Sequence, residues 1–457
     1  MINDKNETRS GLPENWAQMT PEEKRQYRLE KYMNTDGIQF ISPDAEHMYK
    51  IRARRMVDVL NVQEPDRVPI NLPVEDLPLR LQGLNFHTAM YDPEKAYQAV
   101  MKFNEQYCNE LEYFAGLRTA SGRALEFLDY RIYAWPGHGI SDDASGWQYI
   151  EGEYMTAEEY DDLIRDPSDF WLRTYLPRVS GAFEGFKMFQ PFTNISENVH
   201  ISQLMPLGTP QVQDMLQRLM NAGKAFQETG RIMKKYAGMG TAHGFPVMGM
   251  SFCKAPFDIL GDTLRGTRNI MMDMFRRPET LLQAMDVIAD NMIHTILTSP
   301  NILKTCVVSY PLHKGADGWM SKEKFDTFYW PPLKKMMDAF IKEGLIQRMF
   351  AEGSYNTRLE YINEFPKGTV TWHFDQTDMV KAKEILGGQC CLQGNVPISL
   401  LLTGRAEEVK DCCRKLIETC GKGGGYILAP GAMASGVPLE NIWAMSDAVK
   451  EYGVYRT

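Results

Sequence analysis

The chain of 457 residues lacks the features that would place it in a membrane or send it across one. No apolar run approaches the length of about 18 residues that a membrane-spanning helix needs. The opening MINDKNETRSGLPENW contains no hydrophobic core of a signal peptide. We therefore expect a cytoplasmic protein with no membrane partner.

Basic residues form no dense run, and acidic residues outnumber them by 59 to 50, which gives a formal net charge of -9. A groove for nucleic acid requires lysine and arginine clustered along one face. The distribution of charge therefore argues against a nucleic-acid partner.

The cysteines lack the paired spacing of a zinc ribbon or a disulfide framework. We interpret them as reduced thiols, mostly buried. Two pairs are adjacent in sequence, but neighbouring residues on a strand face opposite sides, so a shared metal is not expected. The eight positions are Cys108, Cys253, Cys306, Cys390, Cys391, Cys412, Cys413 and Cys420.

What the sequence does contain is an alternation of helix-length segments with short apolar runs. Hydrophobic residues make up 44% and charged residues 24%, the balance of a globular chain. Residues 1–62 are predicted to be a helical extension, in which PEEKRQYRLEKYM forms one helix and Ser42 or Asp44 caps a second. Residues 63–457 are predicted to form one α/β domain.

Eight of the apolar runs are predicted to be parallel strands that close a (β/α)8 barrel of the TIM type. About 130 residues separate the second strand from the third. This insertion has hairpin character over 131–152 and a helical pattern over 209–237, and we expect it to roof the barrel mouth. The predicted strands are 67–72, 111–117, 246–252, 305–312, 345–351, 369–374, 389–394 and 425–429.

Barrels of this type carry their catalytic groups on the loops that follow the strands. A single polar residue at a strand end is more often a rim charge or a turn former, and for Asn395 and Lys254 this alternative stays open. The polar candidates are Asn71, Lys254, His313, Lys314, Asp317, Glu352, His373, Asp375 and Asn395.

Five separated segments carry a resemblance to a known family: PDRVPI, GFPVMGMSFCKAPFDIL, GADGWMSKEKFDTFYWPPLKKMMD, LQGNVPISLLLTGRAEEV and GGGYILAPGAMASGVPLENIWAM. They resemble the uroporphyrinogen decarboxylase superfamily, which includes corrinoid-dependent methyltransferases. The segments cover most of the predicted barrel, so the resemblance implies this fold, while the reaction stays open.

Two departures argue against the decarboxylase reaction. Where the decarboxylase has an Arg-rich loop for carboxylates, this chain has NLPVEDLPLRLQG, in which only Arg80 is basic and Glu75 and Asp76 are acidic. The Gly-His-Gly of the decarboxylase is replaced by residues 430–432, which read Pro-Gly-Ala. The zinc thiolates of the thiol-alkylating methyltransferases are also missing, because phenylalanine, glutamate and alanine occupy the matching positions 350, 352 and 432.

The chain instead resembles the aryl methyl ether O-demethylase branch, the methyltransferase I components. Its motif is Glu, fourteen residues, Glu, twenty residues, His, and Glu352 and His373 have the second spacing. The first position falls on Met337, next to Asp338. The resemblance implies zinc on Glu352, His373 and Asp338, with Asp317, Asp375 and His313 as alternative third ligands.

This resemblance implies an enzyme that cleaves guaiacol-type or veratrole-type methyl ethers and passes the methyl group to the cobalamin of a corrinoid protein. Glu352, His373 and His313 are the expected catalytic residues, polarising the ether oxygen through a cation or a proton. The alternatives are a porphyrinogen decarboxylase, a thiol methyltransferase, or a non-catalytic scaffold that binds a corrinoid protein. The expected substrate-binding residues are Met248, Tyr310, Phe350, Trp372 and Asn395, with Phe252 and Phe374 as further aromatic candidates.

Overall fold

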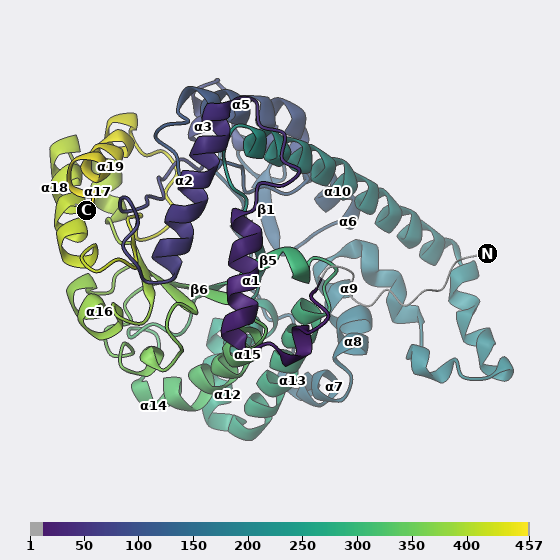
Figure 1. Cartoon of the computed structure of the whole chain (residues 1–457). Coiled ribbons are helices and arrows are strands. Elements are labelled where there is room, and N and C mark those ends of the chain that lie inside the picture. Colours follow the sequence, from purple (N-terminus) through teal and green to yellow (C-terminus); the bar gives the residue numbers. More distant parts are fainter. Residues whose placement is uncertain (1–11, 456–457) are drawn as a thin grey trace.

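The computed structural model describes residues 12–455, and its centre is a six-stranded parallel sheet (Figure 1). The strands pair in the order in which they occur along the chain. Helical segments connect them, as parallel pairing requires. The strands are β4 (Gly249–Phe252), β5 (Thr305–Leu312), β6 (Ile346–Ala351), β7 (Val370–Phe374), β8 (Cys391–Gln393) and β9 (Tyr426–Ile427).

Six of the eight predicted strands are therefore present, and the predicted α/β fold of TIM type is confirmed. The first predicted strand, 67–72, lies beside β9 through one parallel bridge between Ile70 and Leu428. The Asn71 amide donates to the Leu428 carbonyl at 2.8 Å. This segment extends the sheet by one short strand-like stretch.

The second predicted strand, 111–117, is wrong as a strand, because side chains bind its backbone groups. The Ala115 amide donates to Asn104 Oδ1 at 2.8 Å, and Arg52 Nε donates to the Leu111 carbonyl at 3.0 Å. Within residues 12–455, no ladder joins this segment to β4. The ring of strands therefore stays open beside β4.

Helices surround the sheet on its outer face and continue into the insertion. Those before the insertion are α1 (Pro21–Met33), α2 (Pro43–Leu60), α3 (Leu77–Arg80), α4 (Phe86–Tyr91) and α5 (Pro93–Gln106). The insertion holds α6 (Gly122–Leu128), α7 (Tyr160–Arg165), α8 (Pro167–Asp169), α9 (Leu176–Val179) and α10 (Pro210–Ala242). The others are α11 (Pro256–Asp258), α12 (Thr267–Arg276), α13 (Pro278–Leu297), α14 (Lys322–Lys324), α15 (Trp330–Lys342), α16 (Met379–Leu386), α17 (Ile398–Thr403), α18 (Ala406–Cys420) and α19 (Leu439–Tyr452). None of the described helices is both long enough and apolar enough to cross a bilayer.

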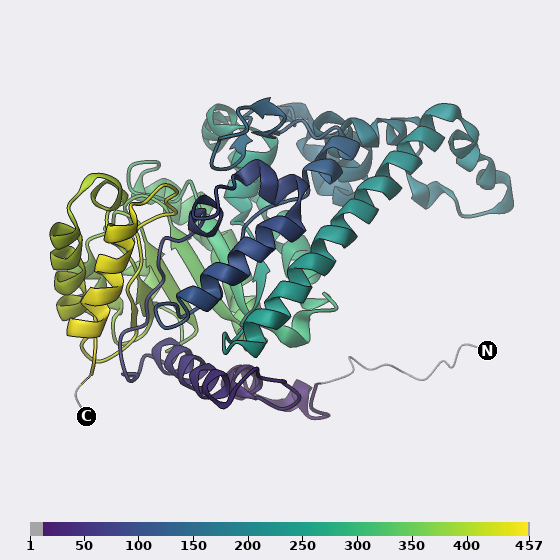
Figure 2. The same cartoon turned by 90° about the horizontal axis from the view of Figure 1, so that it is seen from above.

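The insertion contains both predicted features. A small sheet pairs β1 (Tyr133–Pro136) antiparallel with β3 (Gln148–Tyr149) and parallel with β2 (Gly139–Ile140), which confirms the hairpin character. Helix α10 extends the predicted pattern by five residues beyond 237. Figure 2 shows it running outward from the sheet, on the side away from α18 and α19.

The N-terminal helices close the amino ends of the strands. Helix α1 starts in a capping box, in which Thr20 Oγ1 accepts from the Glu23 amide while the Glu23 carboxylate accepts from the Thr20 amide. Helix α2 is capped by Ser42, which settles the alternative of Asp44. A shared apolar cluster joins both helices to the inner side of the sheet; it includes Leu29, Tyr32, Tyr49, Met56, Val57, Leu60, Val307, Ile346, Cys391 and Ile427.

Strand register decides which side chains face the inside of the sheet. Phe350 on β6 pairs with Pro311 on β5 and with His373 on β7, and the Phe350 and His373 rings are 4.7 Å apart. Their strand neighbours Tyr310 and Trp372 lie in the main core that includes the outer helices. Because side chains alternate along a strand, the inward residues of β6 are Ile346, Arg348 and Phe350.

Arg28 ties α1 to the bottom of the sheet, and its removal tests this attachment. Its Nη1 donates to the carbonyls of Ile302 (2.6 Å) and Thr305 (2.7 Å), and the residue is only 3% exposed. We predict that Arg28→Met lowers the free energy of unfolding by roughly 2–4 kcal/mol, because buried carbonyls lose their donors. Arg54→Met, at a side chain 67% exposed, should change it by less than about 1 kcal/mol. Equal thermal unfolding midpoints of the two variants would contradict this role.

Candidate active site

Three side chains from different elements meet at the carboxyl ends of β4, β5 and β6. Asp262 lies in the π-helical turn Ile259–Leu264 that continues α11, His313 follows β5, and Glu352 follows β6. His313 Nδ1 is 2.5 Å from Asp262 Oδ2, and His313 Nε2 is 3.7 Å from Glu352 Oε1. The imidazole is therefore hydrogen-bonded at one nitrogen and faces a second carboxylate with the other.

Asp262 is the shared partner of this cluster. Its carboxylate also accepts from Lys254 Nζ at 2.6 Å and from Lys314 Nζ at 2.5 Å. Burial opposes the negative charge, but the hydrogen bond from His313 and the charges of Lys254, His313 and Lys314 outweigh burial and hold the pKa of Asp262 far below its usual value. Asp262 is therefore a fixed negative charge.

Asp258, one helical turn before Asp262, holds the loop that carries His313. It is fully buried and accepts from the amides of His313 and Lys314, each at 3.0 Å, and from Tyr329 Oη at 2.7 Å. Burial, with repulsion from Asp262, raises the pKa of Asp258. Its three donors fix the position of the His313 backbone.

The environment of the cluster raises the pKa of both His313 and Glu352. Burial lowers the pKa of His313, but the hydrogen bond to Asp262 and the negative charges of Asp262, Asp258 and Glu352 raise it by more. Burial raises the pKa of Glu352, and nearby carboxylates add to this, although the charge of His313 opposes them. The Glu352 side chain remains 43% exposed, so a proton on it is accessible from the mouth.

His373 lies deeper than the sequence predicts and does not pair with Glu352. Its Nε2 lies 2.8 Å from the Pro430 carbonyl, which can only accept, so the Nε2 proton is present and Nδ1 is the acceptor of a neutral ring. Burial, together with the charges of Arg348 and Arg118, lowers the pKa of His373 to about 4. The expectation of a protonated, donating His373 is therefore wrong.

The predicted metal ligands are not brought together. Asp338 lies on α15, where it accepts from Lys334 Nζ at 2.8 Å, and the histidine beside Glu352 is His313 rather than His373. No three His, Cys, Asp or Glu side chains between residues 12 and 455 are grouped as metal ligands. The donor set therefore does not fit a zinc ion on Glu352, His373 and Asp338.

The other candidates for a third ligand are used in loop structure. Asp317 accepts from Ser354 Oγ at 3.0 Å and from Thr357 Oγ1 at 2.6 Å. Asp375 accepts from the Gly353 amide at 3.0 Å. Both carboxylates thus hold the loop after β6, which carries Glu352.

The predicted aromatic lining is only partly in place. Tyr310 and Trp372 are wrong, since both are fully buried on the helix-facing side of the sheet, as is Phe374. Met248 is also wrong, because it precedes β4 and packs against the cluster at the strand bottoms. Phe350 faces inward, and so does Phe252, which is 68% exposed.

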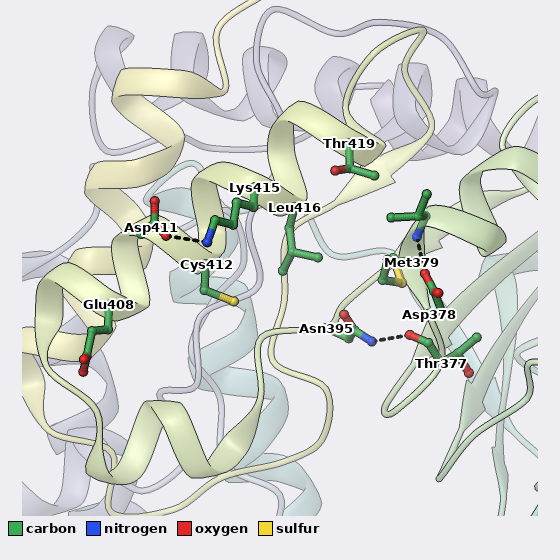
Figure 3. Close-up of a pocket in the computed structure, with 11 residues that line it drawn as sticks. Thr377, Asp378, Met379, Asn395, Glu408, Asp411, Cys412, Lys415, Leu416 and Thr419 are labelled. Carbon is green, nitrogen blue, oxygen red and sulfur yellow. Dashed lines mark hydrogen bonds and ion pairs between the residues drawn. The ribbon is translucent and has the colours of Figure 1, made fainter.

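Asn395 supports a loop, in agreement with the alternative that it is a turn former rather than a substrate-binding residue. Its Nδ2 donates to the carbonyls of Asp375 (3.1 Å) and Thr377 (2.8 Å). It also borders a surface pocket between α16 and α18 (Figure 3). The charged groups in that pocket are already engaged, since Asp378 caps α16 and Asp411 pairs with Lys415 at 2.8 Å.

Sequence reasoning missed Asp258 and Asp262 because they lie within the helical turns after a strand end. Their spacing of four residues in APFDILGD, which puts two acids on one helical face, was the available signal. It also missed Arg348, because only polar residues at strand ends were considered and Arg348 lies within β6.

The charge balance at Asp262 gives a prediction about stability. Asp262→Asn leaves the largely buried ammonium of Lys314 without its carboxylate, so we expect a loss of roughly 3–5 kcal/mol in unfolding free energy at pH 7. The folded-state pKa of Asp262 is depressed, so its contribution exists above the unfolded-state pKa of about 3.9 and disappears as the pH falls toward the folded-state value. Thermal unfolding at pH 7 and pH 3 should show the gap to wild type narrowing, whereas Asp286→Asn should match wild type at both; a constant gap would refute the electrostatic origin.

Comparison with known proteins agrees with this architecture. No curated protein matches the sequence. A solved methyltransferase from Methanosarcina mazei is similar in structure, with a TM-score of 0.55 and 16% identity, over 88% of this chain and 98% of that one. At this identity the likeness concerns the fold. The profile of the family described as Uroporphyrinogen decarboxylase (URO-D) matches residues 214–452, more than half of the chain. The chain therefore belongs to the uroporphyrinogen decarboxylase (URO-D) family.

Proposed function

We propose that this protein is a methyltransferase that cleaves aryl methyl ethers and passes the methyl group to the cobalamin of a corrinoid protein. The observation that carries the proposal is an imidazole with raised pKa, His313, held beside Glu352 at an open strand end. The methyltransferase from Methanosarcina mazei, which shares the fold, supports the reaction class. The methoxylated aromatic and the corrinoid protein are the partners of the proposed reaction.

The reaction breaks the bond between the methyl carbon and the ether oxygen. Reduced cobalt of the corrinoid supplies the electron pair for the new bond to carbon. The electron pair of the broken bond stays on the phenolic oxygen, which needs a proton at pH 7 to leave as a phenol. Proton donation by a positioned side chain contributes about 10²–10⁴-fold to such a step.

His313 is placed to donate that proton. Its Nε2 is 3.7 Å from Glu352 Oε1, which is longer than a hydrogen bond and leaves the Nε2 proton for an incoming oxygen. Asp262 holds the ring by Nδ1 and stabilises the imidazolium. Glu352, whose pKa is raised, then returns a proton to His313 or donates directly.

Inward-facing aromatic side chains below His313 and Glu352 suit an aryl ring. Phe350 is two residues before Glu352 on the same inward row of β6, and Phe252 on β4 lies lower, at the register of Ser309 and Arg348. An aryl ring on such faces would be oriented with its ether oxygen at the mouth, where a partner protein has access. Because the donors do not fit zinc, this mechanism uses only protons and positioning.

The proposal is tested with purified protein, cob(I)alamin, and guaiacol or veratrole, by following the absorbance of methylcobalamin. We predict methyl transfer by wild type and a loss of about 10²–10⁴-fold in His313→Asn, which removes the proton donor. Asp338→Asn removes the residue that the motif suggests as a metal ligand, but in this structure it breaks only a surface ion pair. Its turnover should therefore stay close to that of wild type. No transfer across methoxylated phenols and methoxybenzoates would refute the function, and equal losses in both variants would refute the assigned acid.

A further inference from the structure

A second group of polar side chains lies inside the strand ring, below the acid pair, and has no partner of opposite charge. Arg348 on β6 pairs in register with Ser309 on β5 and Thr371 on β7, so it faces the same interior as Phe350. Within residues 12–455, Arg348 makes no hydrogen bond or ion pair. Burial lowers the pKa of Arg348, and the nearby charge of Arg118 adds to this effect.

Arg118 brings a second guanidinium to this interior. It follows the segment 111–117 on the open side of the ring, and its only hydrogen-bond acceptor is Met433 Sδ, at 3.1 Å, among the described residues. Burial raises the pKa of Glu75 to about 7, although the nearby charge of Arg118 opposes this rise. Among the described residues, no carboxylate oxygen lies within 4 Å of the Arg348 or Arg118 guanidinium. Two guanidinium groups that influence each other electrostatically thus have no ion-pair partner among the described residues.

An orphaned amide points to the same place. Gln393 on β8 pairs in register with His373, faces inward, and is only 3% exposed. Its Nε2 has no hydrogen-bond partner among the described residues. Buried donors are nearly always satisfied in folded proteins, so an unpaired amide that faces the same interior as Arg348 indicates an acceptor that the protein chain does not provide.

We propose that Arg348, Arg118 and Gln393 bind the carboxylate of the substrate, which makes methoxylated aromatic acids the substrate class. Guanidinium groups bind carboxylates through paired, charge-assisted hydrogen bonds. The ether identity rests on the proposed function, but the carboxylate site does not.

The spacing along β6 fits such a molecule. Arg348, Phe350 and Glu352 occupy alternate positions, so all three side chains face inward at successive heights. A rise of about 3.3 Å per residue puts the backbones of Arg348 and Glu352 roughly 13 Å apart. After the two side chains extend toward each other, one aromatic ring fits between them, with its carboxylate at Arg348, its face on Phe350 and its methoxy group at the acid pair.

Binding of 4-methoxybenzoate and of its uncharged amide, 4-methoxybenzamide, tests the carboxylate site by calorimetry on the full-length protein. We expect wild type to bind the acid at least about tenfold more tightly than the amide. Arg348→Met should weaken acid binding by about tenfold or more and leave amide binding within about twofold. Arg118→Met changes an exposed side chain and should likewise weaken binding of the acid but not of the amide. It replaces Arg348→Met as the test if Arg348→Met does not fold.

Arg54→Met, on the outer face of α2, is the matched control and should keep the wild-type preference. Equal binding of acid and amide by wild type, or an unchanged acid affinity in folded Arg348→Met and Arg118→Met, would overturn the carboxylate site. Arginine-dependent acid binding without any methyl transfer to cob(I)alamin would refute the proposed function and leave the site standing. Methyl transfer from guaiacol as fast as from methoxybenzoates would refute the carboxylate site and leave the proposed function standing.

Discussion

The arrangement of the candidate site depends on one largely buried carboxylate, Asp262. A charge removed from water must be balanced by partners nearby, and Lys254, His313 and Lys314 provide that balance from the ends of two strands. Each partner is held in place by the same contact that neutralises Asp262. The raised pKa of His313 follows from this, since a fixed negative charge at Nδ1 stabilises the protonated imidazole against the effect of burial.

The interior of the strand ring is divided by charge along its depth. Acidic side chains and His313 lie at the mouth, the ring of Phe350 lies below them, and Arg348 lies further in on the same row of β6. Neutral His373 separates the two regions, because both guanidinium charges disfavour its protonation. A polar molecule with an aromatic centre would match this order of groups.

Patterns that depend on neighbouring residues could be predicted from the sequence, while contacts across the fold could not. The caps of α1 and α2, the six strands β4 to β9 and the position of Glu352 at a strand end follow from local periodicity. Local pattern also suggests a strand at 111–117, but the distant side chains Asn104 and Arg52 take its backbone groups.

The partner of Glu352 illustrates the same limit. Spacing in the sequence pairs it with His373, yet the height of each residue along its strand brings His313 to Glu352 and leaves His373 one layer lower. Alternation predicts that half of the strand-end aromatics face outward, but only the register shows that Tyr310 and Trp372 are among them.

The protonation state of His313 is the most direct measurement of this account. An NMR titration of the histidine Cε1 protons, with the His313 signal identified by its loss in His313→Asn, gives the pKa of that ring in the intact protein. We expect a value above the pKa of about 6.5 of an unperturbed histidine. A value at or below 6.5 would contradict the cluster built on Asp262 and, with it, the assignment of His313 as the proton donor.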